Sequence, residues 1–103
     1  MKRVFICSPY RGDVKANVAL AVRMCERAVE EGCAPFAPHL MYPSFLDDAV
    51  TADRVIGMAC GMMWMEACDE VWTPKDVEPT EGMKQEIAYA HVVARPIVEK
   101  DVK

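Results

Sequence analysis

The feature that most constrains the fold is a regular alternation of short apolar runs with longer stretches of helical periodicity. The apolar runs are rich in β-branched and aromatic residues, which is typical of strands buried on both faces. Strands that alternate with helices predict a parallel sheet with helices on its faces. The sequence therefore predicts one α/β domain over residues 1–103, with a sheet of about four strands. The expected strands are residues 3–7, 33–37, 69–73 and 95–99, and the expected helices are residues 14–31, 51–67 and 80–94.

Several single residues predict how these elements begin, end and pack. Pro35 has no backbone N–H, so the second strand is expected at an edge of the sheet. Gly32 is expected to end the first helix, Thr51 or Asp53 to cap the second, and Thr80 to cap the third. Helical spacing predicts three buried faces. They are Val18, Ala21, Val22, Cys25 and Val29, then Ile56, Cys60, Met63 and Ala67, then Met83, Ile87, Ala90 and Ala94.

Charge and hydropathy exclude several classes of function. The net charge is −4 and the twelve Lys and Arg residues are scattered, so no basic surface for a nucleic-acid polymer is expected. No apolar run approaches the roughly 20 residues that a membrane span requires. We therefore expect a protein without nucleic-acid or membrane partners.

The motifs of common cofactors and metals are also missing. The chain has five cysteines without a C-x-x-C pair, and two widely separated histidines. These features predict reduced core cysteines in a cytoplasmic protein with no secretory leader, and no metal site. The glycine spacings of dinucleotide-binding and P-loop motifs do not occur, so no cofactor is expected.

The polar residues that remain lie where a parallel sheet places its ligands. Such sheets bind ligands beyond the carboxyl ends of their strands, where the strand order reverses. The loops expected at that end begin at Ser8, Pro38 and Thr73. The candidate site residues there are Tyr10, Arg11, Gly12, His39, Asp47, Asp48, Thr80, Gly82 and Glu86.

Glu86 is the candidate with the most direct chemical use. It lies between Met83 and Ala90 on the helical wheel, at the edge of the expected buried face. Partial burial raises the pKa of a carboxyl group unless donors stabilise its charge. A carboxylate in such a place can attack an anomeric carbon, while a second acid protonates the leaving group. The alternative is a boundary Glu whose stem packs while its head reaches water.

The other candidates have structural alternatives too. Arg11, at a strand end beside a helix start, can receive an anion, but it and Tyr10 can also be ordinary loop residues. His39 either contacts a ligand or bonds a carbonyl group. Asp47 and Asp48 either act in the site or cap the next helix.

Five segments follow one another in a recognisable order. They are residues 7–13 (CSPYRGD), 37–40 (APHL), 45–48 (FLDD), 68–72 (CDEVW) and 82–87 (GMKQEI). Through these segments the chain resembles the small bacterial and phage domains related to nucleoside 2-deoxyribosyltransferases, over essentially its whole length. The likeness to the characterised enzymes depends mainly on the first and last segments.

The resemblance implies a flavodoxin-like three-layer sandwich and an enzyme that acts on the N-glycosidic bond. The substrates would be deoxynucleosides or their 5′-monophosphates, in a transfer or a hydrolysis reaction. Glu86 would be the nucleophile on C1′ of the sugar, and Thr80 and Gly82 would hold the 5′ end, as hydroxyl or phosphate. The relatives also imply a homo-oligomer in which a neighbour completes the site. By the same resemblance the loop of Tyr10, Arg11 and Gly12 would contact the base or the sugar. The full set of predicted substrate-binding residues is Ser8, Tyr10, Arg11, Gly12, His39, Thr80, Gly82 and Met83.

The chain differs from these enzymes in the position of a second acid. The enzymes usually carry one on the helix before the third strand, where residues 61–64 here read GMMW and the next acid is Glu66. Asp47 or Asp48 would then be the second catalytic residue. If neither serves, the chain is a non-catalytic protein that binds or sequesters a nucleotide or an ADP-ribose-like ligand.

Overall fold

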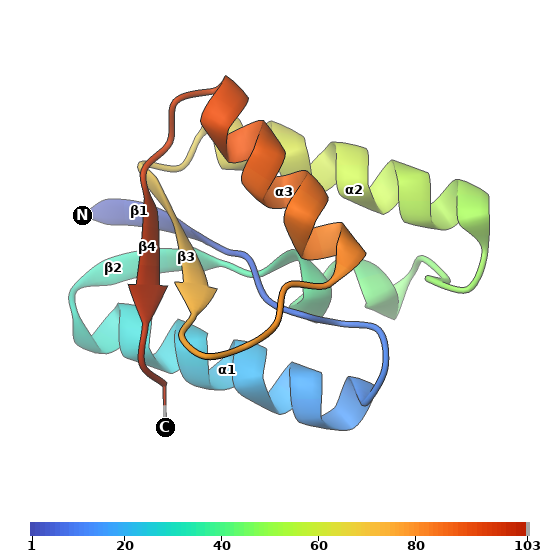
Figure 1. Ribbon diagram of the computed structural model, residues 1–103, viewed down its shortest axis with the longest axis horizontal. Helices are drawn as coiled ribbons and strands as arrows, with labels where there is room; N and C mark the ends of the chain where they lie inside the picture. The colour runs from blue at the N-terminus through green and yellow to red at the C-terminus, as the bar shows by residue number, and fades with distance from the viewer. Residues whose placement is uncertain (103) are drawn as a thin grey trace.

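A four-stranded parallel sheet forms the centre of the structure, a computed structural model that describes residues 1–102 (Figure 1). The strands are β1 (Lys2–Ile6), β2 (Cys33–Phe36), β3 (Glu70–Pro74) and β4 (Ile97–Lys100). The helices are α1 (Val14–Glu30), α2 (Thr51–Glu66) and α3 (Glu81–Val92). In Figure 1, α1 covers one face of the sheet while α2 and α3 lie over the other. These three layers confirm the predicted fold class.

The strand order decides where the loops meet. It is β2-β1-β3-β4, which is the start of the flavodoxin-like order, with β2 at the edge as Pro35 predicted. The chain leaves β1 through α1 to reach β2, and then returns through α2 to β3 on the other side of β1. The strand order therefore reverses beside β1. The loops after β1 and β3, and two short 3-10 turns after β2 (Pro38–Leu40 and Tyr42–Ser44), gather at this point.

The core has two parts, one on each face of the sheet. Val4 and Ile6 of β1 pack with Trp72 toward α1, while Phe5 packs with Val71 toward α2 and α3. All five are at most 1% exposed. Complete burial of one such apolar side chain is worth about 1.5–3 kcal/mol, so the alternation of β1 fixes which face each residue occupies.

The predicted helix caps are confirmed in two of three cases. Thr80 is the N-cap of α3, and its hydroxyl accepts from the Met83 N–H at 3.2 Å. Gly32 follows the end of α1 with a φ of +76°, a left-handed conformation that glycine adopts without strain. The prediction for α2 is wrong, because its N-cap is Val50, which has no side-chain acceptor. Asp53 accepts instead from the Asp47 N–H at 2.9 Å.

The predicted buried face of α1 is turned relative to the observed one. Ala21, Met24 and Ala28 are completely buried, whereas Val22 and Val29 are 42% and 65% exposed. The residues 21, 24 and 28 have the same three- and four-residue spacing as the predicted set. The sequence pattern therefore fits two faces of the helix, the predicted one and the observed one. In the structure, the face that carries Met24 is the one that packs against the sheet.

The predicted face of α2 is also wrong. Gly61 and Met65 are buried, while Ile56 and Met63 are 51% and 71% exposed. Residues 55–65 are apolar almost all round the helix, so periodicity does not identify the inner face. A Cβ at Gly61 would meet the Phe5 ring at 3.9 Å, which is plain packing on a side chain. Among residues 1–102, no helix has both the length and the apolar character to cross a membrane.

The last helix is shorter than predicted. α3 ends at Val92, and Ala94 lies beyond it with a φ of +55°, so Ala94 is not part of the buried face. Met83 and Ala90 are buried as expected, and Ile87 is partly buried. The remaining buried position of this face is Glu86, which carries the only ionisable side chain among the buried residues of α3.

Candidate active site

Glu86 lies in the second turn of α3 and is nearly excluded from solvent. It is 3% exposed, more deeply buried than the boundary position expected from the sequence. Its Oε1 atom has no hydrogen-bond partner among residues 1–102. Buried polar atoms in native proteins almost always have a partner, so an orphaned carboxyl oxygen marks a place that a ligand or water completes.

The surroundings of Glu86 favour the protonated carboxyl group. Burial raises its pKa to about 8, because the charged form would lose its hydration. The thiol of Cys7, which donates to the Met83 carbonyl at 3.8 Å, also lies against the carboxyl and lowers this pKa by a smaller amount. The pKa of Cys7 is itself raised, first by burial and then by the charge of Glu86. At neutral pH both groups are therefore uncharged.

Three adjoining hollows lie at the carboxyl end of the sheet. The inner cavity has about 60 Å³ and is lined by Glu86 with His39, Asp48 and Arg54. The central pocket has about 480 Å³ and lies between the start of α3 and the side of α2. The outer pocket has about 640 Å³ and lies between the β1 loop and residues 43–49. A nucleoside-sized ligand needs a volume of a few hundred Å³, so only the two larger pockets can hold one.

His39 stands on the wall between the inner cavity and the central pocket. Its ring stacks on Tyr10, with the centroids 5.2 Å apart and the planes at 28°. Burial lowers the pKa of His39, whereas the charge of Asp48 and the nearby Ser8 backbone oppose this. The imidazole is therefore neutral at pH 7.

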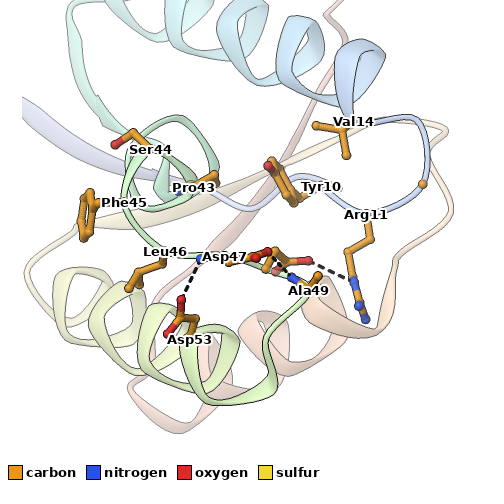
Figure 2. A pocket seen from close by; sticks show the side chains of 12 residues that line it. Tyr10, Arg11, Val14, Pro43, Ser44, Phe45, Leu46, Asp47, Ala49 and Asp53 are labelled. Carbon is orange, nitrogen blue, oxygen red and sulfur yellow. Dashed lines mark hydrogen bonds and ion pairs between the residues drawn. The ribbon is translucent and has the colours of Figure 1, made fainter.

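The loop after β1 is held by bonds from the start of α1. The side-chain amide of Asn17 donates to the carbonyls of Tyr10 and Arg11, both at 3.1 Å. Gly12 has a φ of +101°, which lets the loop turn back into the helix. The guanidinium of Arg11 pairs with Asp48 at 3.1 Å, the dashed contact at the right of Figure 2. This exposed pair positions the loop more than it stabilises the fold.

The two acids of the long loop occupy different places. Asp48 lines all three hollows. Asp47 lines only the outer pocket, where its Oδ1 accepts from the Ala49 N–H at 2.9 Å (Figure 2). The structure thus brings Asp48, but not Asp47, to the cavity of Glu86. Neither acid is the N-cap of α2, since Val50 holds that position.

The remaining predicted site residues fall into two groups: some line a pocket, and the others are buried in the interior. Thr80 and Gly82 line the central pocket at the N-terminus of α3, and Gly12 lines the outer pocket. Ser8 and Met83 are 1% and 2% exposed and line none of the three hollows. The Ser8 hydroxyl, like Glu86 Oε1, lacks a partner among residues 1–102.

Sequence reasoning missed seven residues of the central pocket, among them Arg54, Met58 and Gln85. Arg54 and Met58 of α2 line both it and the inner cavity, and Gln85 of α3 lines it alone. No spacing or motif signalled Arg54, because its place depends on how α2 is turned over the sheet. Two cations, Arg11 and Arg54, and two acids, Asp48 and Glu81, line this pocket, and the amide groups at the start of α3 add a partial positive charge. No group of three or more His, Cys, Asp or Glu able to hold a metal ion occurs in residues 1–102.

One protein family matches the chain at the level of sequence. The sequence model of the family described as Domain of unknown function (DUF7768) matches residues 2–100. No curated protein sequence matches significantly.

Solved structures match at the level of fold. A 2-deoxyribosyltransferase from Bacillus psychrosaccharolyticus aligns over 94% of this chain with a TM-score of 0.71 and 13% identity. A 2-deoxyribosyltransferase from Leishmania mexicana aligns over 100% with a TM-score of 0.62 and 18% identity. A CMP N-glycosidase from Clostridium botulinum aligns over 95% with a TM-score of 0.56 and 16% identity. The chain spans 70%, 66% and 67% of these proteins, and the likeness shows a shared fold.

Proposed function

Because the chain belongs to the DUF7768 family and has the fold of 2-deoxyribosyltransferases, we propose that it is an enzyme of the N-glycosidic bond. Its substrates would be deoxynucleosides or deoxynucleoside 5′-monophosphates, and Glu86 would attack C1′ of the sugar. The observation that carries this proposal is the buried Glu86 carboxyl, which has an orphaned oxygen and faces a cavity next to a nucleoside-sized pocket. A water molecule or a second base would accept the sugar.

The sizes of the hollows support this arrangement. The inner cavity, at about 60 Å³, has room for a few water molecules or for the edge of a sugar ring. The central pocket, at about 480 Å³, has room for the rest of a nucleotide. A substrate in the central pocket would therefore present its anomeric carbon at the boundary with the inner cavity, where Glu86 lies.

The charges and rings of the central pocket support a nucleotide as the ligand. Thr80 and Gly82 place the start of α3 beside Arg11 and Arg54, which favours a 5′-hydroxyl or a 5′-phosphate there. Tyr10, stacked on His39, offers an aromatic face to the base. Both ends of a nucleoside would thus find a partner of matching chemistry.

A second candidate function is binding without catalysis, of a nucleotide or an ADP-ribose-like ligand. Two observations favour it. The α2 segment Gly61–Trp64 brings no acid to the pocket, and Glu86 keeps its proton at neutral pH. A protonated carboxyl group is a poor nucleophile but can still donate a hydrogen bond to a ligand.

A substrate panel separates the two functions. We expect purified protein to release free base from some deoxynucleosides or deoxynucleotides, with or without an acceptor base, as measured by chromatography. Glu86→Ala should stop the release, whereas Glu26→Ala, a change at an exposed acid on α1, should not. Release that is equal in wild type and Glu86→Ala would refute the role of Glu86. No turnover, together with intact nucleotide recovered from the protein by mass spectrometry, would favour binding.

We also propose that the chain forms a homo-oligomer through α2. The outer side of this helix exposes large apolar side chains, namely Val55 at 63%, Ile56 at 51%, Met63 at 71% and Trp64 at 52%. A cluster of this kind on one helix is typical of a protein interface. Val55 also lines the central pocket, so a neighbour docked there would lie next to the site.

Light scattering during size-exclusion chromatography tests the oligomer. We expect wild type to elute as a dimer or larger assembly and Met63→Glu to shift it toward the monomer, because a buried charge at the interface is costly. Val29→Glu is the matched control, since Val29 is 65% exposed on α1. A monomeric wild type, or an equal shift with both variants, would contradict an α2 interface.

The state of the cysteines indicates the redox environment in which the protein works. Cys7, Cys25, Cys33, Cys60 and Cys68 are all free thiols. Free thiols persist in a reducing environment, so we propose that the protein works in the cytoplasm.

A further inference from the structure

We propose that His39 is the general acid and base of the reaction. Its imidazolium protonates the leaving base, and the neutral imidazole then takes a proton from the acceptor. This inference rests on the proposed function and adds a catalytic residue to it. It assigns to His39 the role for which the sequence offered Asp47 or Asp48.

The place of His39 in the wall between two hollows carries the inference. Four residues line both the inner cavity and the central pocket, namely His39, Asp48, Arg54 and Met58. Met58 has no proton to exchange, and an arginine stays charged in proteins. The Asp48 carboxylate is engaged by Arg11 at 3.1 Å. His39 is therefore the shared residue that has an exchangeable proton and forms no ion pair within residues 1–102.

The ring of His39 is held in a defined orientation. It stacks on Tyr10, with the ring centroids 5.2 Å apart. The nearby Ser8 backbone acts to raise the pKa of His39. Stacking fixes the plane of the imidazole and leaves its nitrogens to exchange a proton, as a general acid–base residue requires.

The charged and titratable groups around this wall come from four segments. Arg11 follows β1, Asp48 precedes α2, Asp53 and Arg54 lie in the first turn of α2, and Glu81 and Glu86 lie on α3. Burial is the main cause that leaves Glu86 protonated and His39 neutral at pH 7, and the charge of Asp48 opposes it at His39. Transfer of one proton from the Glu86 carboxyl to His39 creates both a carboxylate nucleophile and an imidazolium acid. Environments that push two pKa values apart in this way are typical of acid and base pairs in active sites.

The proposed steps balance in atoms and charge. The Glu86 carboxylate forms a C–O bond to C1′ while the C1′–N bond to the base breaks. The electron pair of that bond goes to the base nitrogen, which takes the proton of the His39 imidazolium. In the second half, neutral His39 removes a proton from water or from an N–H of a second base. The acceptor then bonds to C1′ and releases the Glu86 carboxylate.

The other acids nearby are less suited to this role. Asp47 lines only the outer pocket. Glu66, the acid nearest to the position used by the related enzymes, accepts from the Tyr89 hydroxyl at 2.6 Å and lines none of the three hollows. His39 would thus serve in place of the second catalytic acid that α2 lacks.

The test compares leaving groups of different basicity. An ordinary base must be protonated as it leaves, whereas 7-methylguanine leaves its nucleoside as a neutral molecule without added protons. We expect His39→Gln to lower the first-turnover rate of base release, which precedes the step where His39 acts as a base, by about 10²- to 10⁴-fold for an ordinary deoxynucleoside or 5′-monophosphate. On the 7-methylguanine analogue the loss should be at most about tenfold, because general acid catalysis is not needed there. His91→Gln, at the exposed second histidine of the chain, is the matched control and should change neither rate.

The outcomes separate this inference from the proposed function. A loss confined to ordinary bases supports His39 as the acid. An equal loss on both substrates shows that His39 only binds or packs, and overturns the inference while leaving Glu86 in its role. A wild type that releases no base from either substrate overturns the proposed function, and the role of His39 with it.

Discussion

Glu86→Gln should stabilise the protein at pH 7 by about 3 kcal/mol, an effect calculated from the pKa shift at 1.36 kcal/mol per unit. Burial raises the pKa of Glu86 from 4.5 to about 8, so the folded state keeps a proton that the unfolded chain has already released. Wild-type stability must then fall as the pH rises from about 4.5 to about 8. Glutamine has nearly the same shape and does not titrate, so the variant escapes this loss.

Urea unfolding across a pH series measures this effect. The difference between Glu86→Gln and wild type should be near zero below pH 4, should grow through neutral pH, and should level off above pH 8. Glu26→Gln, at the exposed acid on α1, removes the same charge and should give no such curve. A flat difference across the series would mean that Glu86 titrates normally and is open to water.

The same variant should be inactive although it is more stable. An amide cannot form the glycosyl ester, so base release should fall by at least about a thousandfold, the scale seen when a nucleophile is removed. A substitution that increases stability and abolishes activity is expected where a protein keeps a destabilising buried group because its function needs it. A Glu86→Gln protein that is stable and fully active would leave Glu86 without a catalytic role.

Trp72→Ala should destabilise the protein by about 3–5 kcal/mol, the usual cost of removing a large aromatic side chain from a core. Trp72 is 1% exposed in β3, and its indole N–H donates to Glu70 at 2.8 Å. The ammonium group of Lys100 lies 4.2 Å from its ring centroid. Because a domain of this size is stable by only about 5–15 kcal/mol, the variant should be close to unfolding at 37 °C.

The second tryptophan provides the control for this change. Trp64 is 52% exposed on α2, so Trp64→Ala should cost the monomer about 1 kcal/mol or less. The chain has two tryptophans, so each variant keeps one fluorescent reporter for the urea transition. Similar costs for the two variants would contradict the core described on the α1 face of the sheet.

The sequence predicted most of the fold because the fold depends on local patterns. The four apolar runs became four parallel strands, Pro35 marked the edge strand, and Thr80 capped α3. The inner faces of α1 and α2 were predicted wrongly. In both helices the apolar residues satisfy more than one helical face, and packing on the sheet decided between them.

The end of the sheet where the candidate site lies was predictable, but its full membership and its geometry were not. The rule that ligands bind beyond the strand ends gathered Tyr10, His39 and Glu86 from three separate segments. It did not show that Tyr10 stacks on His39, or that Arg54 reaches the pocket from α2. These contacts join residues far apart in the chain, and no local spacing encodes them.

By itself, the sequence determined the order of strands and helices, the end of the sheet where a ligand can bind, and Glu86 as the acid of α3 beside the buried face. Only the tertiary structure decided that Glu86 is almost fully buried, with an unpaired oxygen and a raised pKa, and that His39 forms a wall of its cavity. Hydrophobic periodicity is a property of neighbouring residues, whereas desolvation depends on every segment that packs around a group.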